Sequence, residues 1–119
     1  MFRGLQDAAV EALNNSDAWH IERNNIYRER RELVWKMLDH LQCTYRPGQV
    51  GMFLWAGIPD SVEDIEHWVN YILYNHRVFI TPGHIFGERG RRFVRVSLCA
   101  DKGIFREAIN RLNDFNYKL

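Results

Sequence analysis

One short segment limits the possible folds of this chain more than any other. Residues 92–99, Arg-Phe-Val-Arg-Val-Ser-Leu-Cys, alternate between aliphatic and other side chains. Successive side chains of a β-strand point to opposite faces, so the alternation predicts a strand with one face against a core. The aliphatic face carries Val94, Val96 and Leu98. The other face carries Phe93, Arg95, Ser97 and Cys99.

Arg95 lies in the middle of this predicted strand, on the face away from the aliphatic residues. A guanidinium without a partner is costly to bury, so Arg95 needs a carboxylate or phosphate in its planar fork, or access to water. The residues alone are compatible with an ion pair inside the domain, with a solvated edge-strand arginine, or with a site for an acid group from outside. The neighbouring motifs have to decide among these three.

The rest of the chain has the patterns of four helices and two more strands. Apolar residues at helical spacing predict helices over residues 3–13, 18–41, about 61–75, and after residue 101. The expected caps are Asp17, a capping-box-like pair of Ser61 and Asp64, and Asp101. β-preferring residues predict a central strand over 51–57, apolar on both faces, and a strand over 78–80. The order helix, helix, strand, helix, strand, strand, helix predicts an α+β fold, a small three-stranded sheet covered by helices.

Composition limits the class of protein. With 119 residues, 46% of them hydrophobic and four of them Trp, the chain is long enough for one core without disulfides. Sixteen basic and fifteen acidic residues give a charge of +1, which offers no general attraction to nucleic acid or to an anionic membrane. The sequence has no apolar run near the roughly 20 residues of a membrane span and no signal-peptide pattern at its start. We therefore expect a cytoplasmic protein with neither a membrane nor a nucleic-acid partner.

Possible metal, redox and charge clusters have ordinary explanations. Glu63 and His67 are four residues apart on a predicted helix, but the sequence places no third ligand beside them, so we expect no metal site. Cys43 and Cys99 are not at metal or redox spacing, and we expect both to be reduced core residues. The long helix is rich in arginine, at positions 23, 28, 30 and 31, and glutamates at positions 22, 29 and 32 are expected to pair with them.

Turn-forming residues precede the strand that carries Arg95. Proline at position 82 fixes one dihedral angle, and Gly83 permits the next one to be positive. Gly51, Gly83 and Gly87 are each compatible with close approach of backbone to a ligand or with plain turn chemistry. A loop with several glycines is, by itself, more often a mobile connection than a binding site.

Taken together, Pro82-Gly83, Phe86-Gly87, Gly90 and Phe93-Val-Arg95-Val-Ser97 resemble the C-terminal signature of class I and II aminotransferases. These are the pyridoxal phosphate (PLP) enzymes related to aspartate aminotransferase. The similarity continues in the same order through Gln6–Ala9, Tyr27–Arg31, Pro47–Trp55 and the final helix. It implies that residues 16–119 form the small C-terminal domain and that residues 1–15 form a terminal helix leading from a large domain absent from this chain.

The resemblance also implies roles for particular residues. In this family the arginine of the R-x-S pattern, here Arg95, binds the α-carboxylate of the amino-acid substrate. A planar fork of N–H donors matches a carboxylate, which agrees with that role. Gly51, Gly83, Phe86 and Gly87 would form an active-site loop, with Phe86 covering the ligand.

The family's chemistry also needs a lysine that forms a Schiff base with PLP. Lys36, Lys102 and Lys118 are not in the setting of that lysine, so we expect no catalytic and no cofactor-binding residue here, no bound PLP and no activity in the isolated chain. The intact enzyme is expected to use PLP, to move an amino group from an amino acid to a 2-oxo acid, and to be a homodimer. The substrate side chain stays open, as does the choice between a transaminase and a β-lyase or decarboxylase.

A small non-catalytic binding module is the alternative hypothesis. Residues 89–96, Arg-Gly-Arg-Arg-Phe-Val-Arg-Val, loosely resemble the basic and aromatic strand of an RNA-recognition motif. That motif needs exposed stacking aromatics and a basic surface, whereas the net charge here is near zero. A protein-interaction domain with an exposed apolar face is the third possibility.

Overall fold

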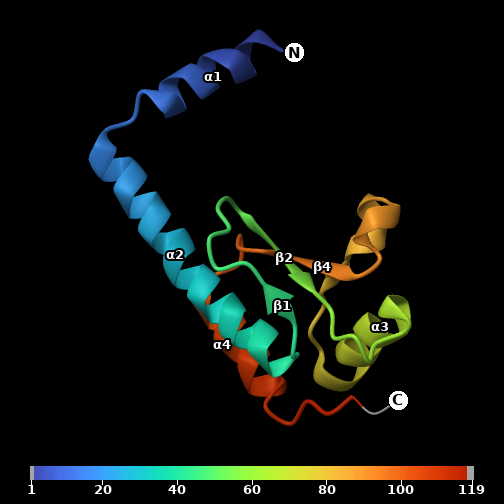
Figure 1. The fold of residues 1–119 in the computed structure, drawn as a ribbon. Helices are drawn as coiled ribbons and strands as arrows, with labels where there is room; N and C mark the ends of the chain where they lie inside the picture. Colours follow the sequence, from blue (N-terminus) through green and yellow to red (C-terminus); the bar gives the residue numbers. More distant parts are fainter. Residues whose placement is uncertain (1, 118–119) are drawn as a thin grey trace.

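The computed structural model describes residues 2–117 (Figure 1). Its helices are α1 (Arg3–Leu13), α2 (Asp17–His40), α3 (Ile65–His76) and α4 (Lys102–Arg111). Its strands are β1 (Thr44–Tyr45), β2 (Phe53–Gly57), β3 (Thr81–Pro82) and β4 (Phe93–Ser97). Two 3-10 turns, η1 (Gly83–Phe86) and η2 (Glu88–Gly90), connect β3 to β4. The predicted α+β class is confirmed.

The strands form one antiparallel sheet in the order β1-β2-β4-β3. Strands β2 and β3 flank β4 and therefore run parallel to each other, with α3 in the connection between them. The sheet has four strands where three were predicted, because Thr44 and Tyr45 pair with Gly57 and Ala56 as an additional edge. A two-residue strand is too short to show any alternation in the sequence.

The strand predicted at 78–80 lies at Thr81 and Pro82 instead, where the chain pairs with β4. Arg77 ends α3 in the left-handed conformation, with φ at 56°. In residues 78–80 apolar side chains alternate between buried and exposed positions, although the segment is not paired with a strand. Val78 and Ile80 are buried, and Phe79 between them is 69% exposed. Burial against a core can therefore imitate the sequence pattern of a strand.

Helix caps explain where three of the helices begin. The Ser16 hydroxyl accepts a hydrogen bond from the Trp19 amide, so Ser16 caps α2 and the predicted cap Asp17 is the first helical residue. Asp64 is itself the cap of α3, and its side chain accepts hydrogen bonds from the amides of Glu66 and His67, in place of the predicted pairing with Ser61. Asp101 caps α4 as predicted.

The core lies between one face of the sheet and helices α2, α3 and α4. Its largest fully buried members are Val34, Leu38, Leu41, Leu54, Val62, Trp68, Ile72, Val94, Leu98 and Leu112. Helices α2 and α4 lie side by side over this core (Figure 1). The ammonium of Lys102 on α4 lies 2.5 Å from a carboxylate oxygen of Glu29 on α2, which holds the pKa of that carboxyl below its usual value.

Helix α1 differs from the other helices. None of its residues is buried, and it lies away from the sheet in Figure 1. Its larger apolar side chains, Leu5, Val10 and Leu13, are all more than half exposed. Nothing in residues 2–117 therefore covers the apolar side of α1.

The arginines of α2 do not follow the predicted pairing with glutamates of the same helix, except for Arg23, which contacts Glu22 at 3.1 Å. Arg30 donates to the carbonyl oxygen of Leu98 at 3.0 Å, just beyond β4. Arg31 donates to the carbonyl oxygen of Gly51 at 3.3 Å, just before β2. These two side chains therefore hold the ends of two central strands to the helix.

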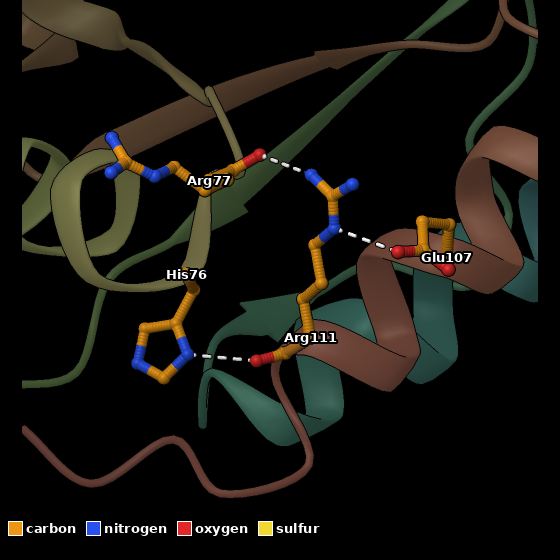
Figure 2. A network of polar contacts seen from close by, with 4 residues as sticks. All are labelled: His76, Arg77, Glu107 and Arg111. Atoms are coloured by element: carbon orange, nitrogen blue, oxygen red, sulfur yellow. Dashed lines mark hydrogen bonds and ion pairs between the residues drawn. The ribbon is translucent and has the colours of Figure 1, made fainter.

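The last turns of α3 and α4 are joined by a small polar network (Figure 2). The Arg111 guanidinium donates to the carbonyl oxygen of Arg77 at 3.0 Å and to the Glu107 carboxylate at 2.9 Å. In return, the His76 ring nitrogen Nδ1 donates to the carbonyl oxygen of Arg111 at 2.8 Å. Two carbonyl groups at helix ends thus find donors, which fixes the position of the chain that leads into β3.

The two cysteines have different environments. Cys43 is buried, and removal from water raises the pKa of its thiol to about 12. Cys99 is exposed, so its predicted place in the core is wrong, because the chain leaves the sheet after Ser97. Within residues 2–117 no helix has the length and apolar character needed to cross a membrane, and no three His, Cys, Asp or Glu side chains are gathered as metal ligands.

Candidate functional site

The sheet face opposite the core forms the candidate site. Its side chains come from β2 and β4, where Trp55 lies directly across from Arg95 and Phe53 across from Ser97. Phe53, Trp55 and Phe93 are 39%, 37% and 42% exposed, in contrast to the fully buried residues of the core face. This aromatic surface, which we call the open face, is not covered by the described helices.

The side chain of Arg95 has no hydrogen bond or ion pair within the described residues 2–117, whereas its backbone pairs with β2 and β3. Its guanidinium carbon lies 4.4 Å from the centre of the Phe53 ring and 3.8 Å from the centre of the Phe86 ring. The ion pair inside the domain, which was one of three possibilities from sequence, is therefore not observed. The N–H donors of Arg95 remain available to an acid group from elsewhere.

The η1 and η2 turns bring Phe86 over this face. A β-carbon on Gly83 would lie 2.5 Å from the carbonyl oxygen of Gly90 and 2.6 Å from that of Phe93, so only glycine fits where these segments meet. The positive φ that a glycine permits is not used at Gly83, since the chain enters a 3-10 turn there. Positive φ angles occur instead at Gly87, 129°, and at Gly51, 87°.

Two cavities lie beside Arg95 or its contact Phe86. The first, about 540 Å³, is lined chiefly by Trp55, Phe86 and Phe93 together with the glycines of the turns. The second, about 710 Å³, lies between β4, the start of α4 and residues 77–81, and Arg95 forms part of its wall. Arg95 itself lines only the second of these cavities, and it is linked to the first through its contact with the ring of Phe86.

The structure groups most of the predicted site residues. Gly83, Phe86 and Gly87 line the first cavity, and Phe86 contacts Arg95. Gly51 does not line either cavity and lies two residues before β2, where its carbonyl oxygen binds Arg31. Its predicted place in the loop that borders the ligand therefore finds no support in this geometry.

Sequence reasoning missed the aromatic residues of β2. The segment 51–57 was interpreted as a central strand with both faces covered, but Phe53 and Trp55 lie on the open face. Their spacing of two residues was the signal that could have placed them beside Arg95. The carboxylate of Glu88, in the loop before β4, lies 2.5 Å from the guanidinium of Arg91, which lowers the pKa of the Glu88 carboxyl. Glu88 is therefore paired with Arg91 and not with Arg95.

The chain is similar in sequence to known aminotransferases. The chain is 32% identical over 111 residues to an LL-diaminopimelate aminotransferase of Oleidesulfovibrio alaskensis, covering 93% of this chain and 28% of the relative. It is 36% identical over 126 residues to the transaminase BacF of Bacillus subtilis, covering 98% of this chain and 29% of BacF. The chain thus spans less than a third of the length of these relatives.

The fold is also similar to that of solved aminotransferase structures. The apo structure of BacF superposes with a TM-score of 0.76 at 31% identity, covering 98% of this chain and 30% of BacF. An aminotransferase from Staphylococcus aureus gives a TM-score of 0.72 at 34% identity, covering 94% of this chain and 30% of that enzyme. The family model for aminotransferase class I and II matches residues 2–112. The chain therefore belongs to the class I and II aminotransferase family.

Proposed function

We propose that this chain is the substrate-closing C-terminal domain of a PLP-dependent aminotransferase and that Arg95 binds the substrate α-carboxylate. The observation that carries the proposal is an arginine in mid-strand with free donors, set among half-exposed aromatic rings. Such partly dry surroundings strengthen the attraction between a guanidinium and a carboxylate. Membership of the family supplies the reaction class, transfer of an amino group from an amino acid to a 2-oxo acid.

The domain division is part of the same proposal. Residues 16–119 would be the small domain, and residues 1–15 the helix that leads from the large domain. The absence of buried residues in α1 supports this division, because a helix without a partner here has its partner elsewhere in a longer chain. The coverage of under a third of each relative supports it as well.

The described lysines do not suit a Schiff base with PLP. Lys102 is bound to Glu29 at the start of α4, and Lys36 belongs to α2 on the other side of the sheet from Arg95. Lys118 lies outside the described residues. PLP, when bound to the intact enzyme, would act as an electron sink and would be held by the remaining two thirds of the protein. This chain would bind and orient the substrate acid group and exclude water, and alone it would be inactive.

For the intact enzyme we further expect a cytoplasmic homodimer with amino-acid and 2-oxo-acid substrates. The RNA-binding alternative is not favoured, because two of the four arginines in residues 89–96 are already occupied and the net charge is only +1. Arg91 binds Glu88, and Arg92 donates to the carbonyl oxygens of Val62 and Pro59. A salt-dependent affinity for single-stranded RNA would restore that alternative.

A chimera tests the proposal. In the chimera, this chain would replace the matching 29% of BacF. PLP absorbance and amino transfer would then be measured for the chimera with Arg95 and for its Arg95→Leu variant. Loss of a bidentate, charge-assisted contact should lower kcat/KM for the amino acid by about a hundredfold or more. Arg28→Leu, at an exposed position of α2, is the matched control and should leave kcat/KM unchanged. Equal kcat/KM in the Arg95→Leu and Arg28→Leu chimeras would refute the role of Arg95.

A further inference from the structure

Two phenylalanines from different parts of the sheet meet at the Arg95 guanidinium. Phe53 belongs to β2 on one side of β4, and Phe86 is the last residue of η1, which follows β3 on the other side. Aromatic faces attract a cation, and a guanidinium can stack on them. Phe53 is 39% exposed and Phe86 is 47% exposed. Removal of the two rings from water is therefore a weak explanation for their position beside Arg95.

The distances indicate how the guanidinium lies. Its central carbon is 3.8 Å from the centre of the Phe86 ring, within the roughly 3.5–4.0 Å of two carbon atoms in contact. An N–H group directed at the ring would hold the central carbon farther away, so this contact is made by the flat side of the guanidinium. The N–H donors lie in the plane of the group and point away from the ring.

Phe86 is itself held in position. Its ring meets Trp55 edge to face with the centres 5.6 Å apart, and Trp55 lies across the sheet from Arg95. The turn that carries Phe86 is closed by hydrogen bonds from the Gly87 amide to the carbonyl oxygen of His84, 3.0 Å, and from the Gly90 amide to that of Gly87, 2.9 Å. The Arg95 guanidinium is therefore packed against an aromatic ring that is itself held in place by Trp55 and by the turn.

We propose that Phe53 and Phe86 are positioning residues that fix the plane of the Arg95 guanidinium and make its site selective for planar carboxylates over tetrahedral oxyanions. A carboxylate has two oxygens in one plane, which match two in-plane N–H donors. A sulfonate or phosphonate carries a third oxygen outside that plane, directed toward the negative face of a ring. The inference rests on the proposed function, since it concerns the same carboxylate site, and it adds the class of acid group that the site accepts.

The test uses the 119-residue chain and side-chain NMR of its arginines, with the Arg95 signals assigned by their loss in Arg95→Lys. Without ligand, rotation of the Arg95 guanidinium should be slow in the native chain and at least about fivefold faster in Phe86→Leu and Phe53→Leu, because stacking hinders rotation. Phe86→Tyr keeps the ring and should restore slow rotation. Phe93→Leu is the matched control, because Phe93 is a half-exposed ring of the same face that makes no stacking contact with Arg95.

The second measurement titrates the same proteins with acetate, methanesulfonate and methylphosphonate and follows the Arg95 Nε–H signal. The native chain should bind acetate at least about fivefold more tightly than either tetrahedral anion, and this preference should vanish in Phe86→Leu. Equal rotation rates and equal preferences in the native chain, Phe86→Leu and Phe53→Leu would overturn the positioning role while leaving Arg95 as a carboxylate site. No response of Arg95 to acetate in the native chain would overturn selectivity and the proposed function together.

Discussion

The two faces of the sheet are both apolar in sequence but differ in what covers them. On the core face Leu54, Ala56 and Val94 are at most 1% exposed, whereas on the open face Phe53 and Trp55 are more than a third exposed. Helices α2, α3 and α4 cover the first face, whereas over the second the described residues place no helix and only the η1 and η2 turns with Phe86. An aromatic face left open around one free arginine is typical of a surface that meets a ligand or another part of a protein.

The difference indicates that the apolar residues of these strands have two separate roles. Those on the core face hold the described residues together, whereas those on the open face contribute little to that packing. Substitutions on the core face should therefore lower stability, and substitutions on the open face should spare it.

The largest effect is expected for Leu54→Ala. Leu54 is fully buried on the core face, so its truncation leaves a cavity and should lower the free energy of unfolding by about 2–5 kcal/mol. Phe93→Ala on the open face should lower it by only about 1–2 kcal/mol, because water can fill the space and part of the ring is already exposed. Denaturant titration monitored by circular dichroism measures both. A greater loss for Phe93→Ala would mean that the open face is covered.

The cysteines should show the next largest effect. At pH 8 the Cys43 thiol stays protonated, because burial raises its pKa to about 12, and it is also shielded from reagents. Labelling needs an accessible thiolate, so Cys99 should react at least about a hundredfold faster than Cys43. Cys43→Ser and Cys99→Ser assign the two rates in a thiol-labelling assay. Comparable rates in native protein would show that Cys43 is not part of the core.

Gly90→Ala should have a smaller effect, located where the turns meet the open face. The new methyl group would collide with the carbonyl of Gly83, and forced shifts of this kind cost about 1–3 kcal/mol. Gly48→Ala is the control, because open space surrounds that position. Thermal unfolding of both variants would check the prediction. Equal melting temperatures would show that the turns are not packed together as described.

Removal of residues 1–15 should have the smallest effect. Since α1 buries none of its residues, the free energy of unfolding of residues 16–119 should stay within about 0.5 kcal/mol of that of the longer chain. Denaturant titration of the shortened chain measures the change. A loss of more than about 1 kcal/mol would indicate that α1 packs on the domain, against the proposed division at residue 15.

The sequence was sufficient for features that depend on neighbouring residues. The four helices, the cap at Asp101 and the alternation that places Arg95 away from the core all depend on short-range patterns, and the structure confirms them. Strand β1 could not be predicted, because two residues carry no periodicity. The position of β3 was wrong because burial of Val78 and Ile80 produces the same alternation as a strand.

Contacts between residues far apart in the chain could not be predicted from the sequence. Arg30 and Arg31 bind carbonyl groups 68 and 20 residues away, and no helical offset reveals such partners. The exposure of Phe53 depends on which sheet face the helices cover, which is a property of the whole arrangement. An ion pair between Arg95 and an acid of the same domain could be set aside only when the strands were placed.

A crystal structure of the BacF chimera with a bound amino acid or 2-oxo acid would test the central claim most directly. The account predicts that two Arg95 nitrogens lie about 2.7–2.9 Å from the two oxygens of the ligand's α-carboxylate. The account would be contradicted if Arg95 were paired with an Asp or Glu of the protein while the α-carboxylate was bound by other residues.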